Sequence, residues 1–122
     1  MSEALTDKTG EAVTVDLDEA RGAYVIRDAS GTDAGRAFYI TGPDGARIFH
    51  HTEVDDAFGG RGLSKVLIAQ SLEGSREQGV TVVPVCPLFV KKLADTGDDY
   101  LAQGGRFRKA TGADIDLVKR EA

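Results

Sequence analysis

The residues best suited to chemistry fall in two short stretches of the chain. The first holds His50, His51 and Glu53, and the second holds Cys86, the only cysteine, directly before Pro87. Histidine and glutamate exchange protons readily, and a cysteine thiolate attacks acyl carbons. These residues are therefore candidates for general acid–base and nucleophilic chemistry. Each also has a structural alternative, because a lone cysteine is often a small buried apolar residue and a strand glutamate is often only solvated.

A glycine-rich stretch lies between these two sets of residues. Residues 56–65 read DAFGGRGLSK, with Gly59, Gly60 and Gly62 inside four positions. Glycines let a backbone approach a ligand closely, and the first turn of a following helix offers unpaired N–H groups and a positive dipole end. The stretch therefore predicts a site for phosphate or pyrophosphate, with a plain packing turn as the alternative. Its spacing fits neither a P-loop nor the dinucleotide-binding glycine pattern.

Apolar runs and helical spacing predict the elements that must hold these residues. Three strands joined by tight turns form an antiparallel meander, and a helix then leads to a fourth, apolar strand. The third strand, the helix and the fourth strand make a parallel crossover, which should be right-handed. The predicted elements are strands over 23–27, 36–41, 46–54 and 80–86, a helix between Leu63 and Gly79, and a short helix over 88–93.

The predicted fold class is therefore α+β, a mixed sheet with helices. Residues 13–17 alternate weakly and predict a short edge strand or an extended lead-in. Pro84 cannot donate to a neighbouring strand, so it predicts an edge, a bulge or a splay in the fourth strand. A further turn of helix is expected around residues 100–101, and the pattern over 106–122 is ambiguous.

The two histidines are neighbours on the predicted strand over 46–54. Side chains alternate along a strand, so His50 and His51 should point to opposite faces and cannot bind one metal ion together. By the same alternation His51 should share its face with Phe49 and Glu53. Two histidines and one cysteine are too few for a structural zinc site, so no metal is expected.

Composition limits the class of protein. The 122 residues, of which 41% are apolar, suit one domain. Six of the 20 acidic residues and one base lie in the first 19 positions, which therefore carry the whole net charge of −5. No basic surface for nucleic acid, no membrane-spanning run and no signal peptide is apparent. A single cysteine cannot form an internal disulfide, and a cytoplasmic location is expected.

The same charge division suggests how the chain is organised. Residues 1–12 are polar and acidic and predict a flexible acidic tail. Residues 13–104 are expected to form the single domain. Residues 105–122 are expected to be a C-terminal extension, either docked or flexible. A monomer or weak homodimer is expected.

The segment from His51 to about Leu93 resembles the GNAT acyltransferase superfamily, specifically its small YjdJ-type branch. The resemblance rests on HTEV at 51–54, GGRGLSKVLI at 59–68 and VVPVCP at 82–87. The superfamily binds the pyrophosphate of acetyl-coenzyme A with an Arg/Gln-x-x-Gly-x-Gly/Ala loop. Aligning Gly62 with the fourth position puts Gly59 first and Ser64 last, so the usual first and last residue types are missing and Arg61 is displaced two places.

The resemblance implies a minimal GNAT-like fold whose sheet splays open to admit the pantetheine arm of acetyl-coenzyme A. It implies an N-acetyltransferase-like enzyme that transfers acetyl to an amine or thiol acceptor, with Cys86, Glu53 and His51 as candidate catalytic residues. The residues it implies for binding the cofactor are Val54, Asp55, Gly59, Gly60, Arg61, Gly62, Leu63, Ser64 and Lys65.

Two routes for the transfer stay open. Either the acceptor attacks directly with Glu53 or water as base, or acetyl passes through Cys86. Tyr100 is a candidate to return a proton to the coenzyme A thiolate, with simple packing as the alternative. Because the acidic surplus lies outside the expected site, removing residues 1–12 should leave coenzyme A affinity intact or slightly improved. The alternative function is a non-catalytic coenzyme A-binding or protein-interaction module.

Overall fold

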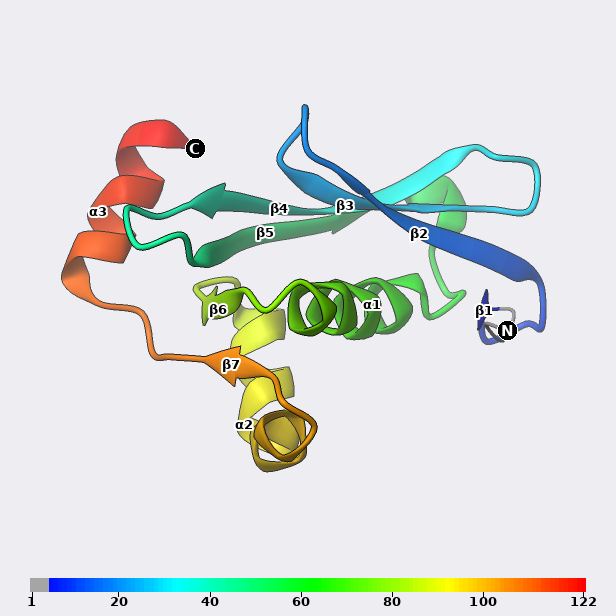
Figure 1. Ribbon diagram of the computed structural model, residues 1–122. Coiled ribbons are helices and arrows are strands. Elements are labelled where there is room, and N and C mark those ends of the chain that lie inside the picture. The colour runs from blue at the N-terminus through cyan, green and yellow to red at the C-terminus, as the bar shows by residue number, and fades with distance from the viewer. Residues whose placement is uncertain (1–4) are drawn as a thin grey trace.

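Seven strands form one mixed sheet whose spatial order follows the chain from β1 to β7 (Figure 1). Strands β1 to β5 pair antiparallel, whereas β6 pairs parallel with β5, and β7 with β6. This confirms the predicted α+β fold. The computed structural model describes residues 5–122, with β1 (Leu5–Thr6), β2 (Ala12–Asp18), β3 (Ala23–Arg27), β4 (Asp33–Thr41), β5 (Arg47–Val54), η1 (Asp56–Phe58), α1 (Leu63–Glu77), β6 (Thr81–Pro84), α2 (Pro87–Ala102), β7 (Arg106–Phe107) and α3 (Gly112–Glu121).

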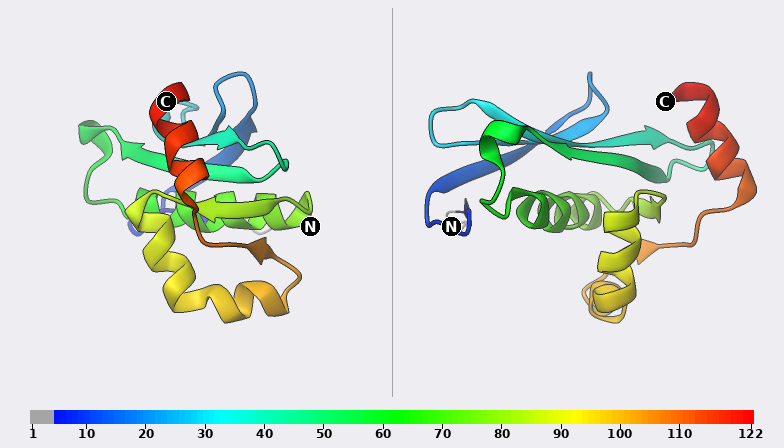
Figure 2. Two further views of the ribbon diagram at one scale, coloured as in Figure 1. Left: turned by 90° about the vertical axis from the view of Figure 1, so that its left-hand side faces the viewer. Right: turned by 180° about the vertical axis from the view of Figure 1, so that it is seen from behind.

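Helix α1 covers one face of the sheet and forms the main core with it (Figures 1 and 2). Its apolar residues recur at helical spacing, and Leu63 and Leu67 are almost completely buried. Gly74 lies against Tyr24, where an added Cβ would stand 2.8 Å from the tyrosine hydroxyl. The helix therefore needs glycine here to approach β3, although glycine is a poor helix former.

Helix α2 is much longer than the sequence pattern predicts. Pro87 occupies its first turn, as expected, but the helix continues without a break to Ala102 and absorbs the separate turn expected around 100–101. Gly97 lies inside it, where an added Cβ would meet the Phe107 ring at 2.7 Å. The glycine marks a close contact between the helix and β7.

Residues 5–12 are folded, which differs from the flexible tail expected over 1–12; residues 1–4 lie outside the described part of the chain. Strand β1 pairs with the start of β2, with Leu5 opposite Val13. Between them the buried carboxylate of Asp7 accepts hydrogen bonds from the N–H groups of Thr9 and Glu11 at 2.8 and 3.1 Å. A carboxylate-centred turn thus orders a segment whose composition resembles a tail.

Residues 105–122 are docked on the rest of the fold. Strand β7 pairs with β6, and α3 contacts β5 and covers a second small core on the other face of the sheet (Figure 2). The carboxylate of Asp114 caps α3 and accepts a 2.6 Å hydrogen bond from Arg108, which also reaches Asp44. Within residues 5–122, no helix has the length and apolar character needed to cross a bilayer.

Candidate functional site

Strands β5 and β6 separate halfway along β5. They pair only from Arg47 to Phe49, and β6 ends at Pro84 opposite Phe49. The carbonyl of Phe49 then accepts from the N–H groups of both Val85 and Cys86, at 2.9 and 2.8 Å, as the second strand turns away into α2. Strand β5 continues to Val54 paired with β4 only, so its other edge faces a gap instead of a strand. Of the edge, bulge or splay that Pro84 predicts, this divergence is the splay, which the resemblance also implies.

A β-bulge in β5 changes which side chains face that gap. Phe38 of β4 pairs with His51 and Tyr39 pairs with Phe49, so His50 is an extra residue between them. Phe49 stacks on Phe89 of α2, and Thr52 contacts Cys86 on the same side. The predicted grouping of His51 with Phe49 is therefore wrong, because the bulge reverses the alternation after His50.

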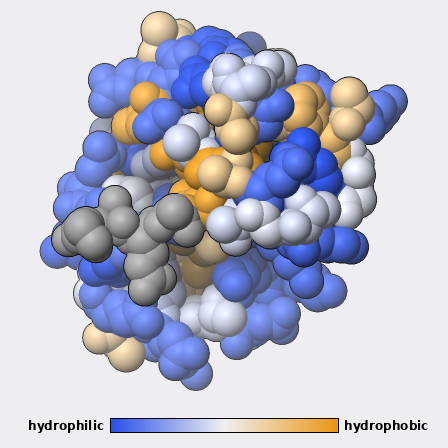
Figure 3. Space-filling model, turned by 90° about the vertical axis from the view of Figure 1, so that its right-hand side faces the viewer, coloured by the Kyte–Doolittle hydropathy of each residue, from blue (hydrophilic) through white to orange (hydrophobic). Residues whose placement is uncertain are grey.

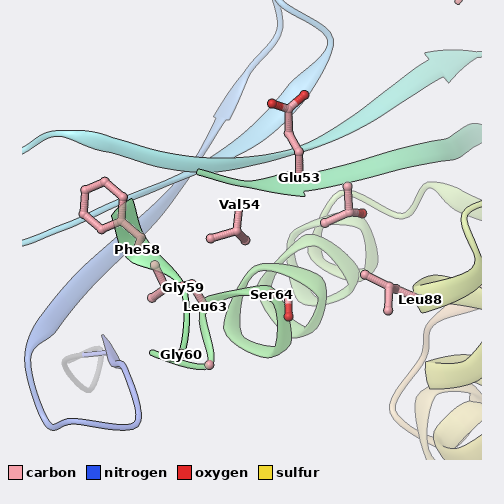
Figure 4. Close-up of a pocket in the computed structure, with 10 residues that line it drawn as sticks. Glu53, Val54, Phe58, Gly59, Gly60, Leu63, Ser64 and Leu88 are labelled. Atoms are coloured by element: carbon pink, nitrogen blue, oxygen red, sulfur yellow. The ribbon is translucent and has the colours of Figure 1, made fainter. Parts of the chain in front are cut away.

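His51 and Glu53 do share a face, on the side of the sheet away from α1. Their side chains approach to 3.6 Å between Nε2 and Oε1, and Arg36 donates a 3.0 Å hydrogen bond to Glu53. In Figure 4 the Glu53 carboxylate points away from α1 while Val54 points toward it. Both His51 and Glu53 are solvent-accessible and could accept a proton. Burial, and to a smaller extent the neighbouring His51, lowers the pKa of His50.

Cys86 lies on the other side of β5 from this pair. It occupies the N-cap position of α2, is buried, and places Sγ 3.5 Å from the hydroxyl of Thr52. The structure thus brings His51 and Glu53 together but separates Cys86 from both. Thr52 is the neighbour that sequence reasoning missed, because the bulge that turns it toward Cys86 leaves no mark in the residue pattern.

The glycine-rich loop borders a hollow at the open end of the gap (Figure 4). Gly60 and Gly62 have φ of 78° and 71°, a backbone region that favours glycine. Gly62 is the N-cap of α1 and has no side chain that could cap the helix. The first N–H groups of the helix have no partner within it, and Gly62, Leu63 and Ser64 of this end line the hollow. The hollow has a volume of about 240 Å³ and is lined by Thr52, Glu53, Val54, Phe58, Gly59, Gly60, Gly62, Leu63, Ser64 and Leu88.

This hollow lies at the end of the molecule that carries η1 and the loop. In Figure 3, which views that end, hydrophobic residues gather in the centre and hydrophilic residues surround them. Leu88 at the start of α2 is 44% exposed beside the hollow. A hollow with a mixed polar and apolar lining and helix N–H groups at its edge suits a ligand that is part apolar and part anionic.

Arg61 does not line the hollow with its neighbours. Its Nε donates to Asp7 at 2.6 Å, a second nitrogen donates to Glu11 at 2.9 Å, and its guanidinium lies over the Phe58 ring. The backbone is tied as well, because the Lys8 N–H donates to the Arg61 carbonyl at 3.0 Å. The charge expected to meet a phosphate is instead neutralised by the amino-terminal segment.

The other two charged residues expected at the site also lie at its edge. The Asp55 carboxylate accepts a 3.0 Å hydrogen bond from Arg36, on the same side as Glu53. Lys65 lines a second hollow next to the first. Of the predicted cofactor-binding residues, the structure therefore gathers Val54, Gly59, Gly60, Gly62, Leu63 and Ser64 around one hollow.

Tyr100 and the basic residues after it lie elsewhere. The Tyr100 hydroxyl donates to the Leu72 carbonyl at 2.8 Å, and burial raises its pKa to about 12. Strand β7, which begins at Arg106, pairs with β6 near the carboxyl end of α1. Helix α1 is about 22 Å long, and the glycine loop lies at its other end. Tyr100 therefore packs the core, and the bulk of α1 separates this basic segment from the loop.

No grouping of three or more histidine, cysteine, aspartate or glutamate side chains suited to a metal ion occurs among residues 5–122. The site therefore comprises four features: the unpaired edge of β5, the N–H groups of the glycine loop, the buried thiol of Cys86 and the exposed pair of His51 and Glu53.

Comparisons with known proteins agree with this geometry. The family model for the GCN5-related N-acetyl-transferase matches residues 23–103, two thirds of the chain. The solution structure of a GCN5-like protein from Staphylococcus aureus has a similar fold, with a TM-score of 0.53, 21% sequence identity, and coverage of 81% of this chain and 91% of that one. No curated protein matches the chain significantly.

Proposed function

Since this chain belongs to the GCN5-related N-acetyltransferase family, we propose that it binds acetyl-coenzyme A between β5 and β6 and transfers the acetyl group to an amine or thiol acceptor. The observation that carries this proposal is the divergence of β5 and β6 after Phe49, which opens directly into the hollow beneath the glycine loop. Free strand edge, apolar lining and free helix N–H groups follow one another in the order that such a ligand needs.

Each part of the gap suits one part of the ligand. The free N–H groups at Gly62 and the start of α1 suit the pyrophosphate. The edge of β5 that β6 leaves unpaired offers backbone donors and acceptors to the amides of the pantetheine arm. The acetyl thioester supplies an activated acyl carbon, and the rest of the reaction depends on what this chain does with protons.

Direct attack by the acceptor fits the placement of the side chains better than a route through Cys86. An amine acceptor loses a proton when it forms the amide bond, and the exposed Glu53, held by Arg36 and next to His51, could accept it. The buried Cys86 thiol has only the hydroxyl of Thr52 as a hydrogen-bonding side-chain partner within the described residues. We therefore infer one step in which the acceptor's bond to the acetyl carbon forms as the thioester bond breaks and coenzyme A leaves.

Intact-mass measurement after rapid quenching separates the two routes. The full chain is mixed with acetyl-coenzyme A alone and compared with Cys86→Ser. A direct route predicts no gain in mass in either protein, and free thiol release only when an acceptor amine is added. A gain of one acetyl group that disappears in Cys86→Ser would establish the two-step route instead.

Titration calorimetry tests the binding step itself. Coenzyme A should bind the full chain, and the absence of heat at millimolar ligand would overturn the proposed function. Binding without thiol release across a panel of amine and thiol acceptors would instead identify a non-catalytic coenzyme A-binding module. Such a module would also retain affinity in Glu53→Gln.

A further inference from the structure

The proposed ligand carries several negative charges, yet the loop arginine is not free to meet them. Arg61 contacts both Asp7 and Glu11, and its guanidinium lies over Phe58. The loop therefore offers N–H dipoles but no unpaired cation of its own. If the site attracts a multiply charged anion, positive side chains from another element must contribute.

A second hollow next to the loop supplies such side chains. It lies between α1 and α2, has a volume of about 420 Å³, and is lined by Ser64, Lys65, Ile68, Leu88, Lys91, Lys92 and Asp95. The two hollows meet at Ser64 and Leu88, which line both. Three of the six lysines of the chain thus gather at one place, with Asp95 as the single acidic residue in the lining.

These lysines are available to a ligand. Within residues 5–122, none of the three forms an ion pair, whereas Arg61 and five other arginines do. Lys65 and Lys91 are exposed and Lys92 is half-buried. The ammonium group of lysine is a compact charge with three donors, and it can turn toward a phosphate that arrives between two helices. Ile68 and Leu88 add an apolar wall of the kind a nucleoside base can contact.

We propose that Lys65, Lys91 and Lys92 bind a terminal phosphate monoester of the ligand, the 3′-phosphate of coenzyme A. The inference rests on the proposed function, because a pyrophosphate at the glycine loop brings the adenosine end of the ligand to the adjoining hollow. It adds a specificity: the protein distinguishes coenzyme A from its 3′-dephospho form through residues of α1 and α2.

Titration calorimetry on the full chain compares coenzyme A with 3′-dephospho-coenzyme A. The unmodified protein should prefer coenzyme A by about tenfold or more, the range expected for hydrogen bonds between charged groups. The double variant Lys91→Gln/Lys92→Gln should lose most of that preference and bind the dephospho form unchanged. The control Lys109→Gln/Lys119→Gln makes the same change in charge outside both hollows and should keep the preference.

Three outcomes would contradict the inference in different ways. Equal affinity of the unmodified protein for both ligands would refute the lysine assignment while leaving the proposed function standing. A preference that survives in the Lys91/Lys92 variant would place the 3′-phosphate elsewhere. Absence of binding by either ligand would overturn the proposed function and this inference with it. Unchanged thermal melting of the variants would exclude unfolding as the cause of any loss.

Discussion

The buried carboxylate of Asp7 accepts a 2.6 Å hydrogen bond from Nε of Arg61, 54 positions later in the chain. The same carboxyl group organises its own turn by accepting from Thr9 and Glu11. One side chain therefore ties the amino-terminal segment to the glycine loop. Because Gly62 follows Arg61 directly, the contact also fixes the backbone that leads into α1.

We expect Asp7→Asn to lower the melting temperature by several degrees and to weaken coenzyme A binding severalfold. The amide removes the negative charge of the buried one of the two carboxylates that pair with Arg61, and only the exposed Glu11 of that pair then opposes the guanidinium. Differential scanning fluorimetry and titration calorimetry measure the two effects. Glu11→Gln is the control, since Glu11 is 65% exposed and its pairing with the same arginine should contribute little.

The same contact reverses the expectation for a shortened chain. Removal of residues 1–12 takes away Asp7, Lys8 and Glu11, all of which contact Arg61. The shortened protein should therefore bind coenzyme A more weakly than the full chain. Intact affinity after this truncation would show that the loop keeps its shape without the amino-terminal segment.

Stability should fall as the pH drops below 3.8, the ordinary pKa of an aspartate. Hydrogen bonds from Thr9 and Arg61 hold the pKa of Asp7 far below its ordinary value of 3.8, and Arg108 does the same for Asp114. Groups with a lowered folded pKa stabilise the protein fully above the unfolded pKa, and that stabilisation is lost as the pH falls below it. Urea unfolding should therefore show a lower free energy of unfolding at pH 3 than at pH 6.

The acid effect can be assigned to a single residue. Asp114→Asn should reduce the difference between pH 6 and pH 3, because the contact with Arg108 no longer depends on protonation. Asp116→Asn, on the same helix and exposed, is the matched control and should leave the difference unchanged. An identical pH dependence in Asp114→Asn and the unmodified protein would contradict this assignment.

Gly74→Ala should destabilise the protein although it improves helix propensity. Alanine is worth about 1 kcal/mol more than glycine in a helix interior. The added Cβ would approach the Tyr24 hydroxyl to 2.8 Å, and that hydroxyl cannot move freely because it accepts from Arg47. Overpacking of this kind costs about 1–3 kcal/mol, so the net free energy of unfolding should fall. Urea denaturation measures it.

The control for this substitution is Gly112→Ala at the start of α3. No atom lies within 4 Å of the Cβ that would be added there. This substitution should be neutral or slightly stabilising. A gain in stability for Gly74→Ala as well would show that β3 and α1 can move apart without cost.

The Cys86 thiol should react slowly with a thiol reagent in the native protein. It is only 4% exposed, and Thr52 lies between it and the hollow. We expect labelling by 5,5′-dithiobis-(2-nitrobenzoic acid) to be slower than in the urea-unfolded chain by about two orders of magnitude or more. Thr52→Ala should accelerate the native reaction, and Thr96→Ala on α2 should not.

The sequence predicts the order of elements well because local patterns carry it. Alternating apolar residues define the meander, Pro87 starts α2, and the glycine-rich stretch marks the junction with α1. The length of α2 is not predicted by the local pattern. The glycine at position 97 is needed because the ring of Phe107, which lies after the helix in the chain, packs against it. A pattern read along one element contains no information about a neighbour that requires space.

Two features of the candidate site escape the sequence for the same reason. The bulge at His50 has no glycine or proline to mark it, and it is defined only by the register between β4 and β5. The pairing of Asp7 with Arg61 joins segments that lie 54 positions apart in the chain. The glycine loop itself is local and predictable, whereas the orientation of the side chains around it depends on long-range contacts.

The short pairing of β5 with β6 has a mechanical consequence. Within the sheet, β6 and β7 are joined to strands β1 to β5 only by the pairing of β6 with β5, and on β5 this pairing spans only Arg47 to Phe49. Amide protons of β6 and β7 should therefore exchange with solvent sooner than those in the middle of β3 and β4. A ligand bound in the gap would contact both β5 and β6 and so add to the short pairing between these strands. Its binding energy would then appear as slower exchange in β6 and as a higher melting temperature that rises with ligand concentration.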